Sequence, residues 1–118
     1  IGGGYQVTTI AVPFGDYPAD ESLIASGEYN GKKYAYTAAL ALGGNPAPSP
    51  FSTKFNPLHI PRIAVTSDTL KAAIDKFKKH PELRYISDGD PAAVSAPAKL
   101  AAQLGNLRDN LGRPVVRY

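Results

Sequence analysis

The sequence predicts an α+β fold, with a mainly antiparallel sheet from the N-terminal half and two C-terminal helices packed on one face of it. β-branched residues and an Asn-Gly turn occur before residue 43, and apolar residues recur at helical spacing after residue 66. No apolar run approaches the length that crosses a bilayer, so no membrane span is expected. At 118 residues, the chain is expected to form a single domain, 1–118.

The first strand is predicted for residues 5–12, "YQVTTIAV", where β-branched residues precede the turn-forming "PFGDYP". The next two strands are predicted from Asn30-Gly31, because a two-residue type I′ turn needs positive φ at both central residues. We therefore expect residues 22–29 to pair with residues 32–42 across this turn.

The register of this hairpin follows from the length of its turn. It sets Gly27 opposite Tyr34, which leaves room for the ring, and Glu28 opposite Lys33, which allows a cross-strand ion pair. Because side chains alternate along a strand, Tyr34 falls on the predicted core face and Lys33 on the solvated face. Only Lys32, at the hairpin tip, is expected to share the side of the tyrosines.

A proline-rich segment, residues 43–61, follows the hairpin and has five prolines between positions 46 and 61. Proline fixes φ and removes a backbone donor, so no regular helix or central strand is expected here. Long connections of this kind are usually functional loops, linkers or arms. Four apolar side chains favour an ordered arm or loop that docks on its own core or on a neighbouring subunit: Phe51, Phe55, Leu58 and Ile60.

The clearest helix signal lies between Thr66 and Pro81. Thr66 or Ser67 supplies an N-cap, basic residues gather near the C-terminal end, and Pro81 ends the helix. An apolar stripe at i, i+3, i+4 and i+7 is formed by Leu70, Ala73, Ile74 and Phe77.

Further elements are predicted around this helix. Short apolar strands at 62–65 and 83–87 would make a right-handed β-α-β unit if they were parallel. A second helix is expected from Ser95, with leucines at helical spacing and Gly112 as its C-cap. Residues 113–118 are expected to finish the chain as an edge strand or tail.

No catalytic, cofactor or metal residues are predicted, and the chain is not expected to be an enzyme. There is no cysteine and no nucleophile-elbow motif. Asp88-Gly89-Asp90 resembles the start of a calcium loop, but the twelve-residue frame from Asp88 ends at Lys99 instead of glutamate, so a tight turn is expected. His59 and His80 have no third ligand at recognisable spacing.

Charge is divided unevenly along the chain. Residues 1–31 contain four acidic residues and no lysine or arginine, whereas residues 32–118 contain all 13 basic residues and six acidic ones. This asymmetry can pair the two parts within a monomer, pair neighbours in an assembly, or attract a polyanion.

These features lead to the hypothesis of a non-enzymatic structural subunit of a homo-oligomeric assembly, of coat, virion or filament type. Its partner is another copy of itself, contacted through the proline-rich segment and the termini. The chain starts at Ile1 without methionine, which fits either removal of a preceding segment or a sequence that was cut before Ile1. The expectation for localisation is a processed protein that is extracellular or virion-associated.

The alternative hypothesis is a single-stranded or non-specific nucleic-acid-binding protein, in which basic side chains follow a phosphate backbone. Asp75 lies four residues from both Lys71 and Lys79, which would compensate part of the helical charge. The candidate contacts are Lys32, Lys71, Lys78, Lys79, Arg108, Arg113 and Arg117.

Overall fold

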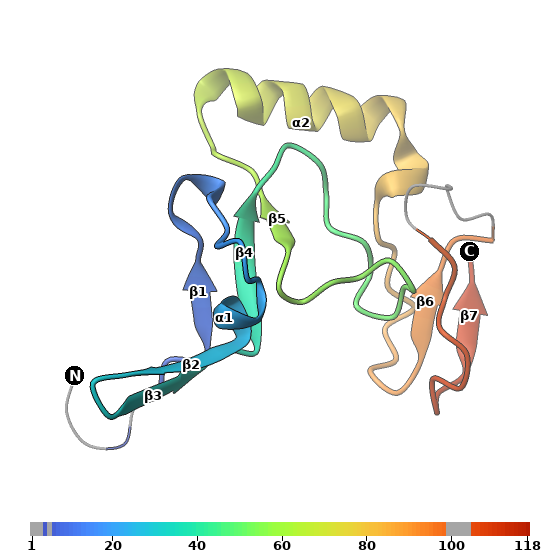
Figure 1. Ribbon diagram of the computed structural model, residues 1–118. Helices are drawn as coiled ribbons and strands as arrows, with labels where there is room; N and C mark the ends of the chain where they lie inside the picture. Colours follow the sequence, from blue (N-terminus) through green and yellow to red (C-terminus); the bar gives the residue numbers. More distant parts are fainter. Residues whose placement is uncertain (1–3, 5, 99–104) are drawn as a thin grey trace. The chain divides into compact units, whose positions relative to one another are not determined.

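The computed structural model describes residues 4, 6–98 and 105–118. By its internal contacts, the chain divides into two compact units (Figure 1). The first consists of Ile1–Asn45 and Asn56–Ile63, and the second of Pro46–Phe55 and Ala64–Tyr118. The proline-rich segment 43–61 is therefore shared between the two units, with residues 46–55 belonging to the second.

The first unit is built on a three-stranded sheet in which every pairing is parallel. Its order is β1 (Thr9–Ala11), β4 (Ala38–Leu42) and β5 (Ile60–Arg62), so β4 is the central strand (Figure 1). β4 reads "AALAL", a short continuous apolar run of the kind that parallel strands show when they are covered on both faces.

A small core lies beside this sheet. Its buried members are Val12, Ile24 and Ala39, and the half-buried Tyr17 and Leu58 pack against them. Ala39 is fully inaccessible to solvent and Val12 is 1% exposed. The residues that close the core thus come from the turn after β1, from a short helix, and from the proline-rich segment.

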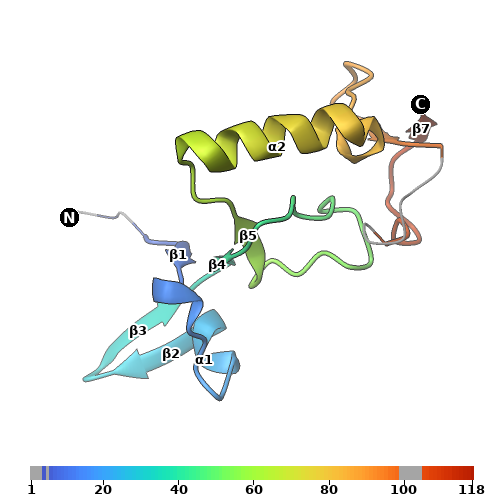
Figure 2. The same cartoon turned by 90° about the horizontal axis from the view of Figure 1, so that it is seen from above.

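The hairpin of the first unit has the predicted register. β2 (Ser26–Tyr29) pairs antiparallel with β3 (Lys32–Ala35), and Figure 2 shows the two strands joined at a tight tip. Asn30 and Gly31 both have positive φ, 50° and 73°, as the type I′ turn requires. Three predictions are confirmed: Gly27 faces Tyr34, Glu28 faces Lys33, and the latter two form an ion pair of 3.8 Å.

The second unit contains the main helix, α2 (Ser67–Lys79), at the predicted position. Thr66 caps it by accepting a hydrogen bond from the backbone N–H of Thr69, whose hydroxyl in turn accepts one from the backbone N–H of Thr66. A short 3-10 helix, η2 (Pro81–Leu83), follows it. No helix in the described ranges is long and apolar enough to cross a membrane.

A parallel strand pair completes this unit. β6 (Val94–Ala96) is buried along its whole length and pairs with the exposed β7 (Val115–Arg117). In the stretch before β7, the backbone N–H of Thr53 donates to the Asn106 carbonyl, and the backbone N–H of Arg108 donates to the Phe51 carbonyl. Residues 51–53 of the proline-rich segment are thus held against residues 106–108 within the same unit.

The predicted fold class is wrong. In the described residues, two of the three sheets are parallel, the β2–β3 hairpin is antiparallel, and there is one main helix instead of two. The hairpin was predicted to extend through residues 36–42, but the chain turns at Thr37, whose backbone N–H and hydroxyl both donate to the carbonyl of Thr8. Residues 38–42 therefore leave the hairpin and join β1 as β4.

The predicted second helix is also not observed where it can be examined. Ser95 lies in a strand, and Gly105, Asn110 and Gly112 all have positive φ, which no right-handed helix accommodates. The centre of the prediction, residues 99–104, lies outside the described residues. Residues 113–118 were predicted as an edge strand or tail, and β7 forms a strand within them, in which Val115 and Val116 are β-branched.

Three shorter predictions need correction. Residues 22–25 form a helical turn, α1 (Ser22–Ala25), before β2 begins. β5 occupies 60–62 instead of 62–65, and residues 84–87 are not a strand, so the β-α-β unit is not formed. A local preference for extended backbone predicts a strand here, but residues 84–87 pair with no strand in the described part of the chain.

Candidate functional site

An open hollow of about 680 Å³ lies in the second unit and is lined by residues between 106 and 117. Its lining includes three arginines, Arg108, Arg113 and Arg117, and one carboxylate, Asp109. The arginines were predicted as separate points of contact with a phosphate backbone. The reversal of the chain between residues 105 and 112 and the return of β7 beside β6 bring them to one place.

Each of these arginines is positioned by backbone carbonyls of its own unit. Arg108 donates to Ser52 from Nε at 3.1 Å and to Phe55 from a terminal nitrogen at 3.3 Å. Arg117 donates to Pro97 at 3.0 Å, and Arg113 donates to Pro91 at 3.4 Å. Since a guanidinium has five N–H donors, each of the three keeps donors beyond those used here.

The remaining predicted basic contacts lie elsewhere. Lys32 is at the tip of the hairpin in the first unit, whereas Lys71, Lys78 and Lys79 are on α2 and do not line the hollow. The expected compensation by Asp75 is not seen as ion pairs, because no carboxylate lies within 4.0 Å of Lys71 or Lys79 in the described part of the chain.

The predicted apolar stripe of α2 is present but not buried. Leu70 is 49% exposed and Ile74 is 46% exposed, while Ala73 and Phe77 are half-buried. No residue of the helix is buried. An amphipathic helix normally gains most of its stability by covering such a stripe, so this exposure marks α2 as a candidate contact surface.

Lysines flank this stripe on α2. With 3.6 residues per turn, Lys71 and Lys78 adjoin Ile74 on one edge, at i−3 and i+4. Asp68 and Asp75, seven residues apart, fall on the side away from Leu70 and Phe77. The α2 face, defined here as the stripe with Lys71 and Lys78, is therefore apolar at its centre and positive along an edge.

The four predicted inter-subunit residues are half-buried in their own units. Leu58 packs against the core of the first unit, and Ile60 lies in β5 opposite Leu40. Phe51 lies near the guanidinium of Arg113, which is 5.9 Å from the ring centroid. Contact with a neighbour through these residues stays a prediction.

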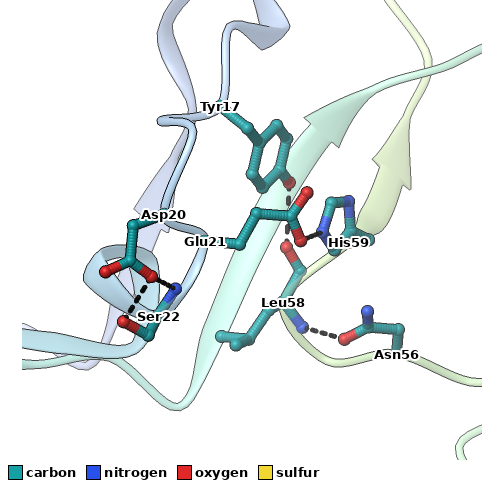
Figure 3. A network of polar contacts seen from close by, with 7 residues as sticks. All are labelled: Tyr17, Asp20, Glu21, Ser22, Asn56, Leu58 and His59. Carbon is teal, nitrogen blue, oxygen red and sulfur yellow. Dashed lines mark hydrogen bonds and ion pairs between the residues drawn. The ribbon is translucent and has the colours of Figure 1, made fainter.

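A cluster around Tyr17 and His59 was not predicted from the sequence (Figure 3). The Tyr17 hydroxyl donates to the carbonyl of Leu58 at 2.8 Å, and the Tyr17 ring stacks on His59. Nε2 of His59 lies 3.0 Å from a carboxylate oxygen of Glu21. These contacts join residues 17–21 to residues 58–59.

Two groups at this cluster have shifted pKa values. Burial raises the pKa of Tyr17 above its ordinary 10.0, the negative charge of Glu21 adds to the rise, and Arg62 opposes it. Hydrogen bonds from the hydroxyl and backbone N–H of Ser22 lower the pKa of Asp20. The ionised carboxylate of Asp20 therefore stabilises the N-terminal end of α1 by accepting hydrogen bonds from Ser22.

The Asp88-Gly89-Asp90 sequence forms the expected turn. Gly89 has a φ of 84°, Asp88 accepts from the backbone N–H of Asp90, and Asp90 accepts from that of Ala92. Across the described residues, no group of three or more histidine or acidic side chains is arranged to hold a metal ion.

Phe14 is a surface feature that sequence reasoning missed. It lies in the 3-10 helix η1 (Pro13–Gly15), is 88% exposed, and has a φ of 56°. Positive φ is uncommon for a bulky residue and is a local strain. The signal in the sequence was the flanking Pro13 and Gly15, which indicated a turn but not the display of an aromatic ring.

Comparisons with protein-family models, with curated proteins and with solved structures find no significant match to this chain.

Proposed function

We propose that this protein is a non-enzymatic subunit of a homo-oligomeric assembly, of coat or filament type. The observation that carries the proposal is the exposure of the α2 face, with Leu70 and Ile74 each close to half accessible. Burying such side chains contributes about 25 cal/mol per Å² of apolar surface. A second copy of the chain that covers α2 would supply this stabilisation.

The small size of each buried core supports the same proposal. The buried apolar residues of the described chain are Val12, Ile24 and Ala39 in the first unit and Val94 and Ala96 in the second. Domains of this length usually bury roughly two-thirds of the surface that they expose when unfolded. Association with a second copy would bury further apolar surface in addition to the little that these cores bury.

The distribution of charge favours a second copy of the chain as the partner. It also favours a contact in which a positive surface of one copy meets a different, acidic surface of the other. Lys71 and Lys78 border the α2 face, so two α2 helices laid against each other would bring like charges together. Residues 1–31 contain four acidic residues and no lysine or arginine, and they display Phe14 beside the exposed Asp16. A contact between this region and the α2 face of a neighbour repeats head to tail, which builds rings or filaments.

Sedimentation and light scattering across a range of protein concentrations test the proposal. The wild-type chain should increase in mass with concentration, and Leu70→Glu should lower that mass. Ala72→Glu is the matched control, because it places the same charge on α2 away from the stripe. A wild-type monomer at high concentration, or equal effects of the two variants, would contradict the proposal.

Mixing two defective variants tests the head-to-tail contact directly. Leu70→Glu disrupts the α2 face, and Phe14→Lys places a positive charge beside Asp16 that would repel Lys71 and Lys78, so each variant alone should remain monomeric. Together they keep one intact contact and should form a one-to-one dimer that grows no further. Failure of the mixture to associate would refute this mode of contact while leaving assembly through another surface open to the concentration test.

The alternative, a single-stranded or non-specific nucleic-acid-binding protein, is favoured by the convergence of Arg108, Arg113 and Arg117 on one hollow. Such a protein would bind an oligonucleotide with an affinity that falls steeply as salt rises. An absence of binding at about 50 mM salt would remove this alternative.

A further inference from the structure

We infer that the arginine-lined hollow of the second unit is a binding site for phosphate groups. The inference goes beyond assembly and does not depend on it, because all the described residues that line the hollow come from the 106–117 stretch of one chain. It also differs from the nucleic-acid alternative, since the ligand is defined by its phosphate chemistry and not by a polynucleotide chain.

The first argument is the positive charge of the lining arginines, which no described carboxylate neutralises in an ion pair. Among the described residues, none of Arg108, Arg113 and Arg117 forms an ion pair, although Asp109 lines the same hollow. Among the described residues, the lining thus carries three positive side chains and one negative one. This balance matches a dianion, such as a phosphate monoester or two neighbouring phosphodiesters, better than a single carboxylate.

The second argument is the geometry of the donors. Backbone carbonyls of Ser52, Pro91 and Pro97 hold the three guanidinium groups, so their orientation is set before a ligand arrives. Planar guanidinium groups bind phosphate oxygens through paired N–H donors, which lysine cannot reproduce. Positioning by carbonyls leaves the charge intact while reducing the side-chain entropy lost on binding.

The third argument is the character of the rest of the lining. The hollow of about 680 Å³ falls in the size range of small-molecule sites. Its described apolar lining consists of aliphatic side chains, and the Phe51 ring, which lies 5.9 Å from the Arg113 guanidinium, is not part of that lining. Recognition is therefore expected to follow the phosphate charge and to be indifferent to the attached base or sugar.

Calorimetric titration of the full chain with pyrophosphate tests this inference. Replacing both Arg113 and Arg117 by glutamine should weaken binding at least about tenfold, because each charge-assisted hydrogen bond contributes on the order of a factor of ten. Replacing both by lysine should restore only part of the affinity. The matched control, Lys71→Gln with Lys78→Gln, removes the same charge from α2 and should leave pyrophosphate binding unchanged.

A second variant protects the test against simple misfolding. Asp109→Asn removes the one negative side chain of the lining and should tighten pyrophosphate binding about threefold. The absence of saturable binding by the wild type would overturn the inference. The inference would also be overturned if the Lys71→Gln/Lys78→Gln control lost as much pyrophosphate affinity as the Arg113→Gln/Arg117→Gln variant. An unchanged pyrophosphate affinity in Asp109→Asn would overturn it as well.

Competition distinguishes the two sources of phosphate. A short single-stranded oligonucleotide that displaces pyrophosphate, and is weakened by the same arginine variants, assigns the hollow to nucleic acid. If the oligonucleotide does not compete while pyrophosphate binds, the hollow takes free phosphate compounds and the nucleic-acid alternative fails independently. Either result supports a phosphate site. If neither pyrophosphate nor the oligonucleotide binds, the inference is overturned.

Discussion

The rings of Tyr17 and His59 stack with their centroids 4.2 Å apart and their planes 9° from parallel. The two residues are far apart in sequence, and the stack holds the chain after β1 against the chain before β5 (Figure 3). Together with the hydrogen bond from Tyr17 to Leu58, it ties the two sequence-distant parts of the first unit to each other.

Removing the Tyr17 hydroxyl should lower stability by about 1 kcal/mol, because the Leu58 carbonyl loses a donor in a half-buried position. Tyr17→Phe keeps the stack and isolates this loss, whereas Tyr17→Ala also removes the ring and should cost about 2 to 4 kcal/mol. Urea unfolding measures both. Tyr85→Phe, at a tyrosine that is 70% exposed, is the control and should change little.

Stability should fall as pH rises above 10. The folded chain holds the proton of Tyr17 more tightly than the unfolded chain does, since burial raises the pKa of Tyr17 above 10.0. Above pH 10 the unfolded chain therefore loses this proton first and is favoured. Urea unfolding between pH 9 and 11 should show a steeper decline for the wild type than for Tyr17→Phe, and parallel curves would contradict this assignment.

Gly27→Ala should destabilise the hairpin by about 1 to 3 kcal/mol. A Cβ at this position would overlap the Tyr34 ring, whose hydroxyl is held by a 2.7 Å hydrogen bond to the Leu23 carbonyl. Thermal unfolding measures the loss. Gly44→Ala provides the control, because nothing lies within 4 Å of its Cβ position and its φ is not positive; an equal effect there would show that the Tyr34 contact is unimportant.

Thr66→Ala should cost about 1 kcal/mol and reduce the helical circular dichroism of the first turn of α2. The substitution removes the side chain that accepts from the Thr69 backbone N–H, and it breaks one half of the reciprocal cap. Ser67→Ala is a suitable comparison, because the cap does not use the Ser67 side chain. Equal stability of the two variants would argue against the cap.

The parts of the fold that the sequence predicted correctly are local. The hairpin register depends on two turn residues, Asn30 and Gly31, and α2 depends on its cap and on a stripe within thirteen residues. Pairings between distant segments were missed, because β4 joins β1 and β5 by parallel registers that hydrophobic alternation does not encode. The leucine spacing after residue 95 resembled a helix, although Gly105 and Gly112 occupy left-handed backbone there.

The sequence likewise predicted the local parts of the candidate sites but not the parts that depend on contacts between distant residues. Lys71 and Lys78 were placed correctly on α2, because helical spacing alone decides which side chains adjoin the stripe. The approach of Arg108, Arg113 and Arg117 required a loop reversal and a strand pairing, and neither has a signature in composition. The exposure of Phe14 depends on a backbone φ that few phenylalanines adopt.

The parallel pairing of Leu40 with Ile60 also constrains the order in which the chain can fold during synthesis. When residue 45 emerges from the ribosome, β1 and β4 are available for pairing, but β5, the strand that covers the other edge of β4, has not yet emerged. The first unit must wait for a further eighteen residues, ten of which belong to the second unit. During that interval the uncovered edge of β4 is a site for pairing with other nascent chains, and a chaperone that shields it would improve the yield of native protein.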